Sequence, residues 1–303
     1  MNAEEQARAD IVEVGRRLWA RGFVASNDGN ISIRLGDNRL ITTPKSVSKG
    51  FMTPDMMVIT DLQGVRVAGE REPSSELKMH LEVYRNRPDA RAVVHAHPPT
   101  ATGFAVAGIP LDRAVLAEVI TTLGSIPLAE YATPSTEELP AAVRKYVKAH
   151  DGILLANHGA LALAGDVFAA YYRMETIEHF ARISLVAHTL GRENLLSRTE
   201  VDRLQGLRGM YGIASPAPIC TDDTTAPDGA QLDCQVVQAP ESTARLVPYA
   251  PSHSDALIDR LNDARSSANG VQMTGSRPGT DEEIRLTYRE LTALIEDAVR
   301  QLK

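Results

Sequence analysis

Three histidines stand at the ends of two apolar segments, where they are suited to bind a metal ion. His95 and His97 close an apolar, β-branched segment. Residues two apart on a strand point to the same face, so these two would present their imidazoles side by side. His158 ends the second segment and could complete the set, with Gly159 after it letting the backbone approach closely. Three histidines without a nearby cysteine favour Zn2+, with Mn2+, Co2+ or Fe2+ as alternatives. The competing interpretation is a solvated strand end and a hydrogen-bonded core histidine.

Glu76 follows Pro73, Ser74 and Ser75 at the predicted start of a helix. A carboxylate in the first turn gains from the helix dipole, so capping alone would explain it. The same helix start offers free N–H groups and two hydroxyls, which is what a phosphate or another anion needs. Upstream, Gly29 precedes the side-chain amide of Asn30, a signal too common to assign a role by itself.

Hydrophobic periodicity predicts the elements that must hold these residues. In chain order they are a helix to about residue 20, strands at 31–35, 40–41, 57–60 and 65–67, a helix starting at Pro73, buried strands at 92–97 and 152–159, and a long helix at 166–190. The wide apolar stripe of the last helix indicates packing on more than one side.

Composition excludes several classes of protein. The 303 residues are 43% hydrophobic and 23% charged, as in ordinary globular proteins, and the net charge of -7 argues against nucleic-acid binding. The sequence has no apolar stretch of membrane-spanning length and no apolar run at its N-terminus, which favours a cytoplasmic protein without membrane contact. Two cysteines, Cys220 and Cys234, cannot form a disulfide framework.

The C-terminal part of the sequence changes character. Seven prolines punctuate residues 213–279, a Ser/Thr/Asp-rich stretch that reads as a linker. Residues 280–303 regain a helical pattern, with Thr280 and Glu283 forming a capping box. An amphipathic helix behind a linker is typical of a tethered binding element. Docking back on the same protein, or self-association as a small coiled coil, is the alternative.

Taken together, these features resemble the class II aldolase/adducin family, in particular its L-fuculose-1-phosphate aldolase branch. The resemblance spans residues from about 5 to 212. It is carried by an ordered series of motifs: Gly29-Asn30-Ile31-Ser32, Thr43-Pro44, Pro73-Ser74-Ser75-Glu76, His95-Ala96-His97, Tyr131-Ala132-Thr133 and Asn157-His158-Gly159. It implies a three-layer α/β/α domain, residues 1–212, with a largely antiparallel central sheet, assembled as a homotetramer with sites near subunit interfaces.

The resemblance also assigns roles. It implies that His95, His97 and His158 bind one zinc ion and that Glu76 is the catalytic acid/base, a role that would require a pKa raised by partial burial. The phosphate-binding set it implies is Gly29, Asn30, Lys45, Ser46, Ser74 and Ser75. Tyr211 resembles the family's C-terminal tyrosine, which reaches towards a neighbouring subunit's site.

Two departures from the aldolase pattern concern the substrate. Lys45 and Ser46 stand where the aldolases have Thr-Gly in the phosphate loop, and residues 111–118 contain no counterpart of the tyrosine found there in the aldolase branch. The expected function is zinc-dependent cleavage of a ketose phosphate, fuculose-1-phosphate-like, to dihydroxyacetone phosphate and a small aldehyde such as lactaldehyde. The alternatives are a dehydratase or decarboxylase using the same zinc and glutamate, and a non-catalytic adducin-like interaction module. Residues 280–303 resemble encapsulation peptides that bind shell proteins of bacterial microcompartments.

Overall fold

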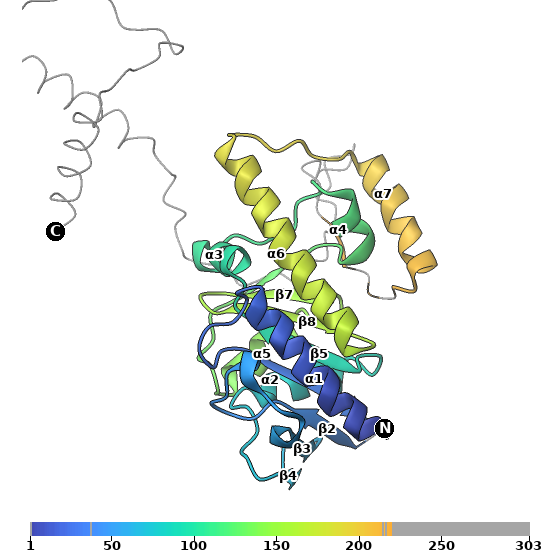
Figure 1. Cartoon of the computed structure of the whole chain (residues 1–303). Coiled ribbons are helices and arrows are strands. Elements are labelled where there is room, and N and C mark those ends of the chain that lie inside the picture. Colours follow the sequence, from blue (N-terminus) through green and yellow to red (C-terminus); the bar gives the residue numbers. More distant parts are fainter. Residues whose placement is uncertain (1, 37, 214, 216, 220–303) are drawn as a thin grey trace, which may run out of the picture. The chain divides into compact units, whose positions relative to one another are not determined.

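A mixed sheet forms the central layer of the described domain, as seen in a computed structural model (Figure 1). The structure describes residues 2–36, 38–213, 215 and 217–219. Within them the sheet has eight strands in the order β4-β3-β2-β1-β5-β8-β7-β6, all neighbours antiparallel except β6 and β7. The strands are β1 (Asn30–Leu35), β2 (Arg39–Thr42), β3 (Val58–Asp61), β4 (Arg66–Ala68), β5 (Ala92–Ala96), β6 (Leu128–Ala129), β7 (Gly152–Leu155) and β8 (Gly159–Ala164).

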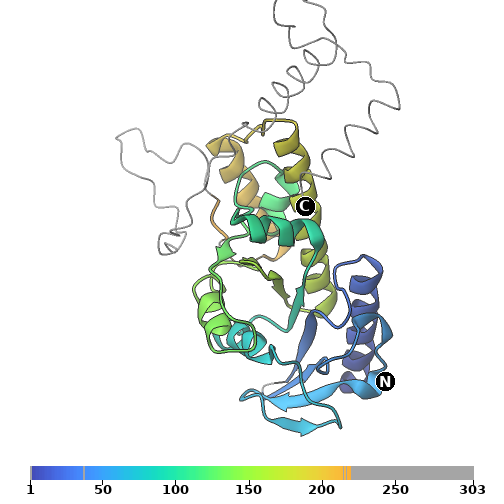
Figure 2. The ribbon, with the colours of Figure 1, turned by 90° about the vertical axis from the view of Figure 1, so that its left-hand side faces the viewer.

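Helices cover both faces of this sheet (Figures 1 and 2). They are α1 (Ala3–Ala20), α2 (Leu77–Asn86), α3 (Pro99–Ala107), α4 (Ala117–Thr122), α5 (Glu138–Arg144), α6 (Val167–Thr189) and α7 (Arg198–Leu207), with short 3-10 turns η1 (Lys49–Phe51), η2 (Pro54–Met56) and η3 (Arg208–Tyr211).

Alternation along the strands separates two apolar cores. On β5, Val94 packs into the core shared with α1, α3 and α6, whereas its neighbour Val93 packs into the core shared with α2 and α5. Both valines are fully buried, because each face of the sheet carries a layer of helices. The expected three-layer α/β/α domain with a largely antiparallel central sheet is confirmed.

The predicted elements are largely confirmed, with one difference that matters for the site. The apolar segment 152–159 is a strand only as far as Leu155, and Asn157 and His158 form the turn into β8, which the sequence analysis did not predict. Asn157 has a φ of 55°, a left-handed conformation that asparagine adopts more readily than most residues. The turn therefore brings His158 back towards the end of β5.

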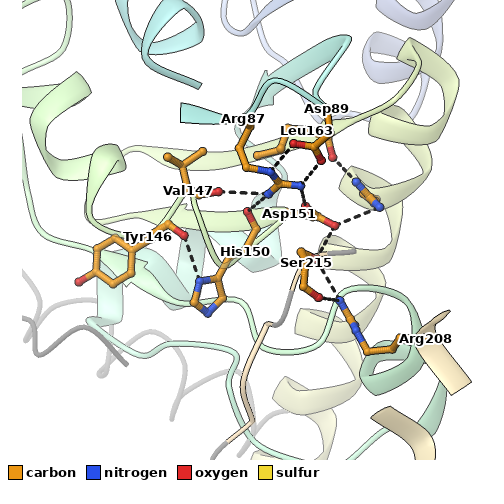
Figure 3. Close-up of polar contacts among 10 residues, drawn as sticks. Arg87, Asp89, Tyr146, Val147, His150, Asp151, Leu163, Arg208 and Ser215 are labelled. Carbon is orange, nitrogen blue, oxygen red and sulfur yellow. Dashed lines mark hydrogen bonds and ion pairs between the residues drawn. The ribbon is translucent and has the colours of Figure 1, made fainter. Parts of the chain in front are cut away.

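A buried cluster of charges fastens the end of the described chain to the domain (Figure 3). Asp151 accepts hydrogen bonds from Arg87 at 2.8 Å and from the Ser215 hydroxyl at 2.7 Å, and it pairs with Arg173 at 3.1 Å. Arg208 donates to the backbone oxygen of Ser215 at 2.9 Å. Described residues therefore remain packed on the domain beyond residue 212, as far as Ile219, which is 7% exposed.

The predicted linker and C-terminal helix are not tested by the structure. Of residues 213–279, only 213, 215 and 217–219 are described, and all of 280–303 lie outside the described residues. Among the helices that are described, none is long and apolar enough to cross a membrane.

Candidate active site

The antiparallel pairing of β5 with β8 brings the three histidines together. Ala96 lies opposite Ala160 in this ladder, so His158, just before β8, faces the end of β5 that carries His95 and His97. The ring centroids are 4.7, 4.9 and 5.1 Å apart, with interplanar angles of 63–67°. One ligand atom from each ring lies within 4.8 Å of the other two. The rings thus form a nearly three-fold cluster around one point.

Gly159 makes this close approach possible. A Cβ atom at this position would lie 2.5 Å from Cδ2 of His97 and 2.6 Å from the backbone oxygen of Ala96. Real Cβ atoms do not approach other atoms so closely, so any side chain here would force β8 away from β5. The spacing of the cluster depends on a glycine after His158.

The spacing, orientation and protonation of the histidines suit the binding of a metal ion. His95 directs Nδ1 at the carbonyl oxygen of Ala160, 2.9 Å away, so Nδ1 carries the proton and Nε2 offers a lone pair. That Nε2 lies 3.1 Å from Nε2 of His97. Zinc–nitrogen distances of about 2.0–2.1 Å in a tetrahedral site separate two ligand nitrogens by about 3.3 Å. Burial lowers the pKa of both His95 and His97, which favours the neutral form that binds metals. The donor set therefore fits a divalent metal.

Glu76 lies beside this cluster and is 12% exposed. Its Oε1 is 3.1 Å from Nε2 of His158 and its Oε2 is 3.4 Å from Nε2 of His95. Burial raises the pKa of Glu76, but the hydrogen bonds from His158 and Asn30 to its carboxylate outweigh it and hold the pKa below its ordinary value. The expectation of a raised pKa is thus wrong for this arrangement. Glu76 is an ionised carboxylate positioned to accept a proton.

The start of α2 differs slightly from the prediction. The helix begins at Leu77, and Glu76 is its N-cap residue with φ -103° and ψ 13° rather than a member of the first turn. The hydroxyl of Ser74 accepts a hydrogen bond from the backbone N–H of Glu76 at 3.3 Å. Ser74 thereby holds the chain in the bend that turns the carboxylate towards the histidines.

Backbone pairing holds the predicted phosphate-binding residues on neighbouring segments. The N–H of Ser74 donates to Thr43 at 3.1 Å, and the N–H of Lys45 donates to Glu72 at 2.9 Å. Ser46 has a φ of 60°, the left-handed conformation that glycine adopts most easily. The backbone at Ser46 therefore has the conformation that favours glycine, the residue that the aldolases carry at this position.

The remaining phosphate candidates differ in exposure. Asn30 is 3% exposed at the start of β1, and Gly29 before it has a φ of 71° and lies against the backbone of His95. The side chains of Lys45 and Ser75 are exposed. This segment therefore combines a buried amide with groups open to solvent.

Tyr211 is the predicted site residue that the fold does not bring to the others. It lies in η3 and is 66% exposed. Within the described part of the chain it makes no polar contact with Glu76 or the histidines. Any role in catalysis would have to be played in another subunit's site.

Three residues around the site were not predicted from the sequence. Asp28 Oδ2 lies 3.5 Å from Nδ1 of His97, and the buried Lys49 donates to the backbone of the loops on both sides of the phosphate candidates. Glu178 accepts hydrogen bonds from the N–H groups of Thr100 and Ala101 at the start of α3, just after His97. Asp28 directly precedes Gly29, which is the one signal that could have drawn attention to it.

Comparison with known proteins identifies the family. The family described as Class II Aldolase and Adducin N-terminal domain matches residues 9–185. A 5-deoxy-D-ribulose 1-phosphate aldolase of Bacillus thuringiensis serovar kurstaki is 34% identical over 210 residues, covering 69% of this chain and 98% of the relative. An L-fuculose phosphate aldolase of Methanococcus maripaludis is 33% identical, covering 60% and 97%. A 3-oxo-tetronate 4-phosphate decarboxylase of Pectobacterium atrosepticum is 29% identical, covering 61% and 87%.

Solved structures agree with this assignment. An L-fuculose 1-phosphate aldolase structure matches with a TM-score of 0.64 and 30% identity, covering 68% of this chain and 96% of that one. The L-fuculose-1-phosphate aldolase of Thermus thermophilus matches with a TM-score of 0.54 and 31% identity, covering 64% and 100%. This chain belongs to the class II aldolase and adducin family. The matched relatives are aldolases and decarboxylases, and the chain is an enzyme of the lyase class.

Proposed function

We propose that this protein is a zinc-dependent aldolase that cleaves a ketose 1-phosphate, fuculose-1-phosphate-like, to dihydroxyacetone phosphate and a small aldehyde such as lactaldehyde. The observation that carries the proposal is the convergence of three imidazoles and the Glu76 carboxylate, with Glu76 Oε1 3.1 Å from Nε2 of His158. The names of the aldolase relatives supply the substrate class.

The residues of the chain divide the reaction between them. His95, His97 and His158 would hold the zinc ion, which when bound supplies positive charge that stabilises the electron pair left on the ketone fragment when the carbon–carbon bond breaks. Glu76 would move the proton to and from the carbon that keeps this pair. Asn30, Ser74 and Ser75 would bind the phosphate together with Gly29, Lys45 and Ser46, and Tyr211 would act in a neighbouring subunit of a homotetramer.

A decarboxylase of a phosphorylated keto acid is the second candidate, and a dehydratase would use the same groups. Two observations favour considering the decarboxylase: a relative of that name is 29% identical, and residues 111–118 contain no tyrosine to protonate an aldehyde. A non-catalytic adducin-like module is disfavoured, since such a module has no need for three imidazoles and a carboxylate at one point.

Two measurements test the proposal. Elemental analysis of the purified chain is expected to find about one zinc per subunit, and chelation should abolish turnover until zinc is restored. Assays of metal-loaded protein on a panel of ketose phosphates and phosphorylated keto acids then separate aldol cleavage from decarboxylation. Absence of bound metal, or full activity after chelation, would contradict the proposal.

We further propose that residues 280–303 direct the enzyme to the shell of a bacterial microcompartment. The support is the amphipathic pattern behind a proline-rich stretch. Deleting 280–303 is expected to leave catalysis intact and abolish shell association. Lost catalysis would instead favour docking on the protein itself.

A further inference from the structure

Lys49 carries a buried positive charge that forms no ion pair with any residue the structure describes. Lys49 is the first residue of η1, which packs against α1, and it is 2% exposed. The ammonium group donates to the backbone oxygen of Asn27 at 2.8 Å and to that of Val47 at 2.7 Å. An ammonium group has three N–H donors, so after these two hydrogen bonds one has no partner among the described residues.

No described carboxylate forms an ion pair with this ammonium group. Asp28 and Glu76 favour the charged form of Lys49 electrostatically without forming an ion pair with it. Asp28 instead pairs with His97, and Glu76 pairs with His95 and His158. Burial lowers the pKa of Lys49 to about 8. Buried charges in proteins are ordinarily paired, so an unpaired ammonium calls for an anion from outside the chain.

The two hydrogen bonds place this charge at the segments already assigned to phosphate. Asn27 lies two residues before Gly29, and Val47 directly follows Ser46. The ammonium group therefore ties together the loop before β1 and the loop after β2. Lys45, four residues before, differs in being exposed to solvent.

We propose that Lys49 supplies the fixed positive charge of the phosphate subsite, so that the site selects doubly charged phosphate monoesters over singly charged analogues of the same shape. This rests on the proposed function only for the location of the phosphate. Lys49 acts through electrostatics at close range in a region of low dielectric, where a unit difference in ligand charge has a large effect.

Binding of ethyl phosphate and ethyl sulfate to the metal-loaded full chain tests this near neutral pH. The two esters have nearly the same shape but carry about two and one negative charges. Wild-type protein is expected to prefer ethyl phosphate by about tenfold or more. Lys49→Gln, which keeps N–H donors for the two loops, and Lys49→Met should each remove most of that preference by weakening ethyl phosphate selectively. Lys145→Gln is the matched control and should keep it, because Lys145 pairs with Glu130 and lies outside the phosphate-binding set.

The outcomes separate the possible causes. Equal weakening of both esters in Lys49→Gln would show that the residue only ties the loops and would overturn the proposal, as would an unchanged preference. If the variants fail to fold, calorimetry of ethyl phosphate binding to wild-type protein near the Lys49 pKa of about 8 decides. Binding should be accompanied by proton uptake, because the phosphate favours the charged lysine. Binding without proton uptake would contradict the proposal.

The proposed function fails on different evidence. If Ser74→Ala/Ser75→Ala protein and wild-type protein bind ethyl phosphate equally, the phosphate subsite itself is misplaced. If that variant weakens binding and Lys49→Gln does not, the subsite stands and Lys49 has no part in it. Because these readouts are binding rather than turnover, absence of aldol cleavage would not affect them.

Discussion

Asn30 donates a hydrogen bond from Nδ2 to Oε2 of Glu76 at 2.9 Å, across 46 positions of sequence. Asn30 also lies opposite His95 in the pairing of β1 with β5. Asn30 thus connects the Glu76 carboxylate to β5, the strand that carries His95 and ends just before His97. The amide fixes the carboxylate so that its other oxygen, Oε1, faces His158.

Glu76→Gln is expected to retain the metal and lose turnover. Glutamine is nearly the same size and keeps an oxygen acceptor, but it cannot accept and return a proton, so kcat should fall by about 10²–10⁴. The measurement is kcat on the best ketose phosphate together with zinc content. Glu72→Gln is the control, because the Glu72 side chain is 70% exposed and pairs with Arg66. Full activity of Glu76→Gln would remove the assignment.

Much of the site could be predicted from local patterns. Two histidines two apart on a buried strand share a face whatever the rest of the fold does, and Glu76 after two serines marks a helix start. These features depend on neighbouring residues alone.

Other parts depend on which segments meet in space. The sequence predicts His158 as the third histidine, but it does not predict the pairing of β5 with β8 (Gly159–Ala164) that brings His158 to the other two. Glu178 caps α3 from a helix 78 positions away from Thr100, and Lys49 is buried by its contact with α1. Contacts between segments that are distant in sequence produce no periodic pattern in either segment, so they could not be predicted from the sequence.

Gly159→Ala is expected to reduce zinc binding. The added Cβ would meet His97 and the backbone of Ala96 at 2.5 and 2.6 Å, so β8 must shift, at a cost of about 1–3 kcal/mol in the free energy of unfolding. Zinc content and affinity should both fall, measured by elemental analysis and competition with a chelator. Gly165→Ala, where a Cβ would have no atom within 4 Å, is the matched control. Unchanged zinc affinity in Gly159→Ala would show that the histidine spacing tolerates the shift.

His80 is expected to make folding stability depend on pH. It is 1% exposed on α2, bonded to the Ser32 hydroxyl at 2.7 Å, and burial lowers its pKa from 6.5 to about 4. Between pH 6.5 and about 4 the unfolded chain binds more protons at His80 than the folded chain does. The contribution of His80 to folding stability is therefore fully present above pH 6.5 and is lost as the pH falls towards 4. The loss from this residue is about 3 kcal/mol.

Urea unfolding of wild-type protein and His80→Gln across that pH range measures this contribution. The other buried histidines contribute to both proteins and cancel in the difference. His80→Gln should show a smaller decrease in stability on acidification, whereas His179→Gln, at an exposed position on α6, should behave as wild type. Identical slopes for wild type and His80→Gln would contradict the prediction.

Asp151→Asn is expected to destabilise the domain strongly. Asp151 is 1% exposed and neutralises Arg87 and Arg173 while accepting from Ser215. Its loss leaves Arg173 without an acidic partner among the described residues and Arg87 with only Asp89. Breaking such a pair costs about 3–5 kcal/mol in the free energy of unfolding. Asp89→Asn removes the other acidic partner of Arg87, but that side chain is 56% exposed and the cost should stay below about 1 kcal/mol. Limited proteolysis beyond residue 208 should also accelerate in Asp151→Asn, because the amide has one acceptor oxygen where the carboxylate gives separate oxygens to Arg87 and Ser215. Equal stability of the two variants would show that the Asp151 cluster does not hold residues 213–219 on the domain.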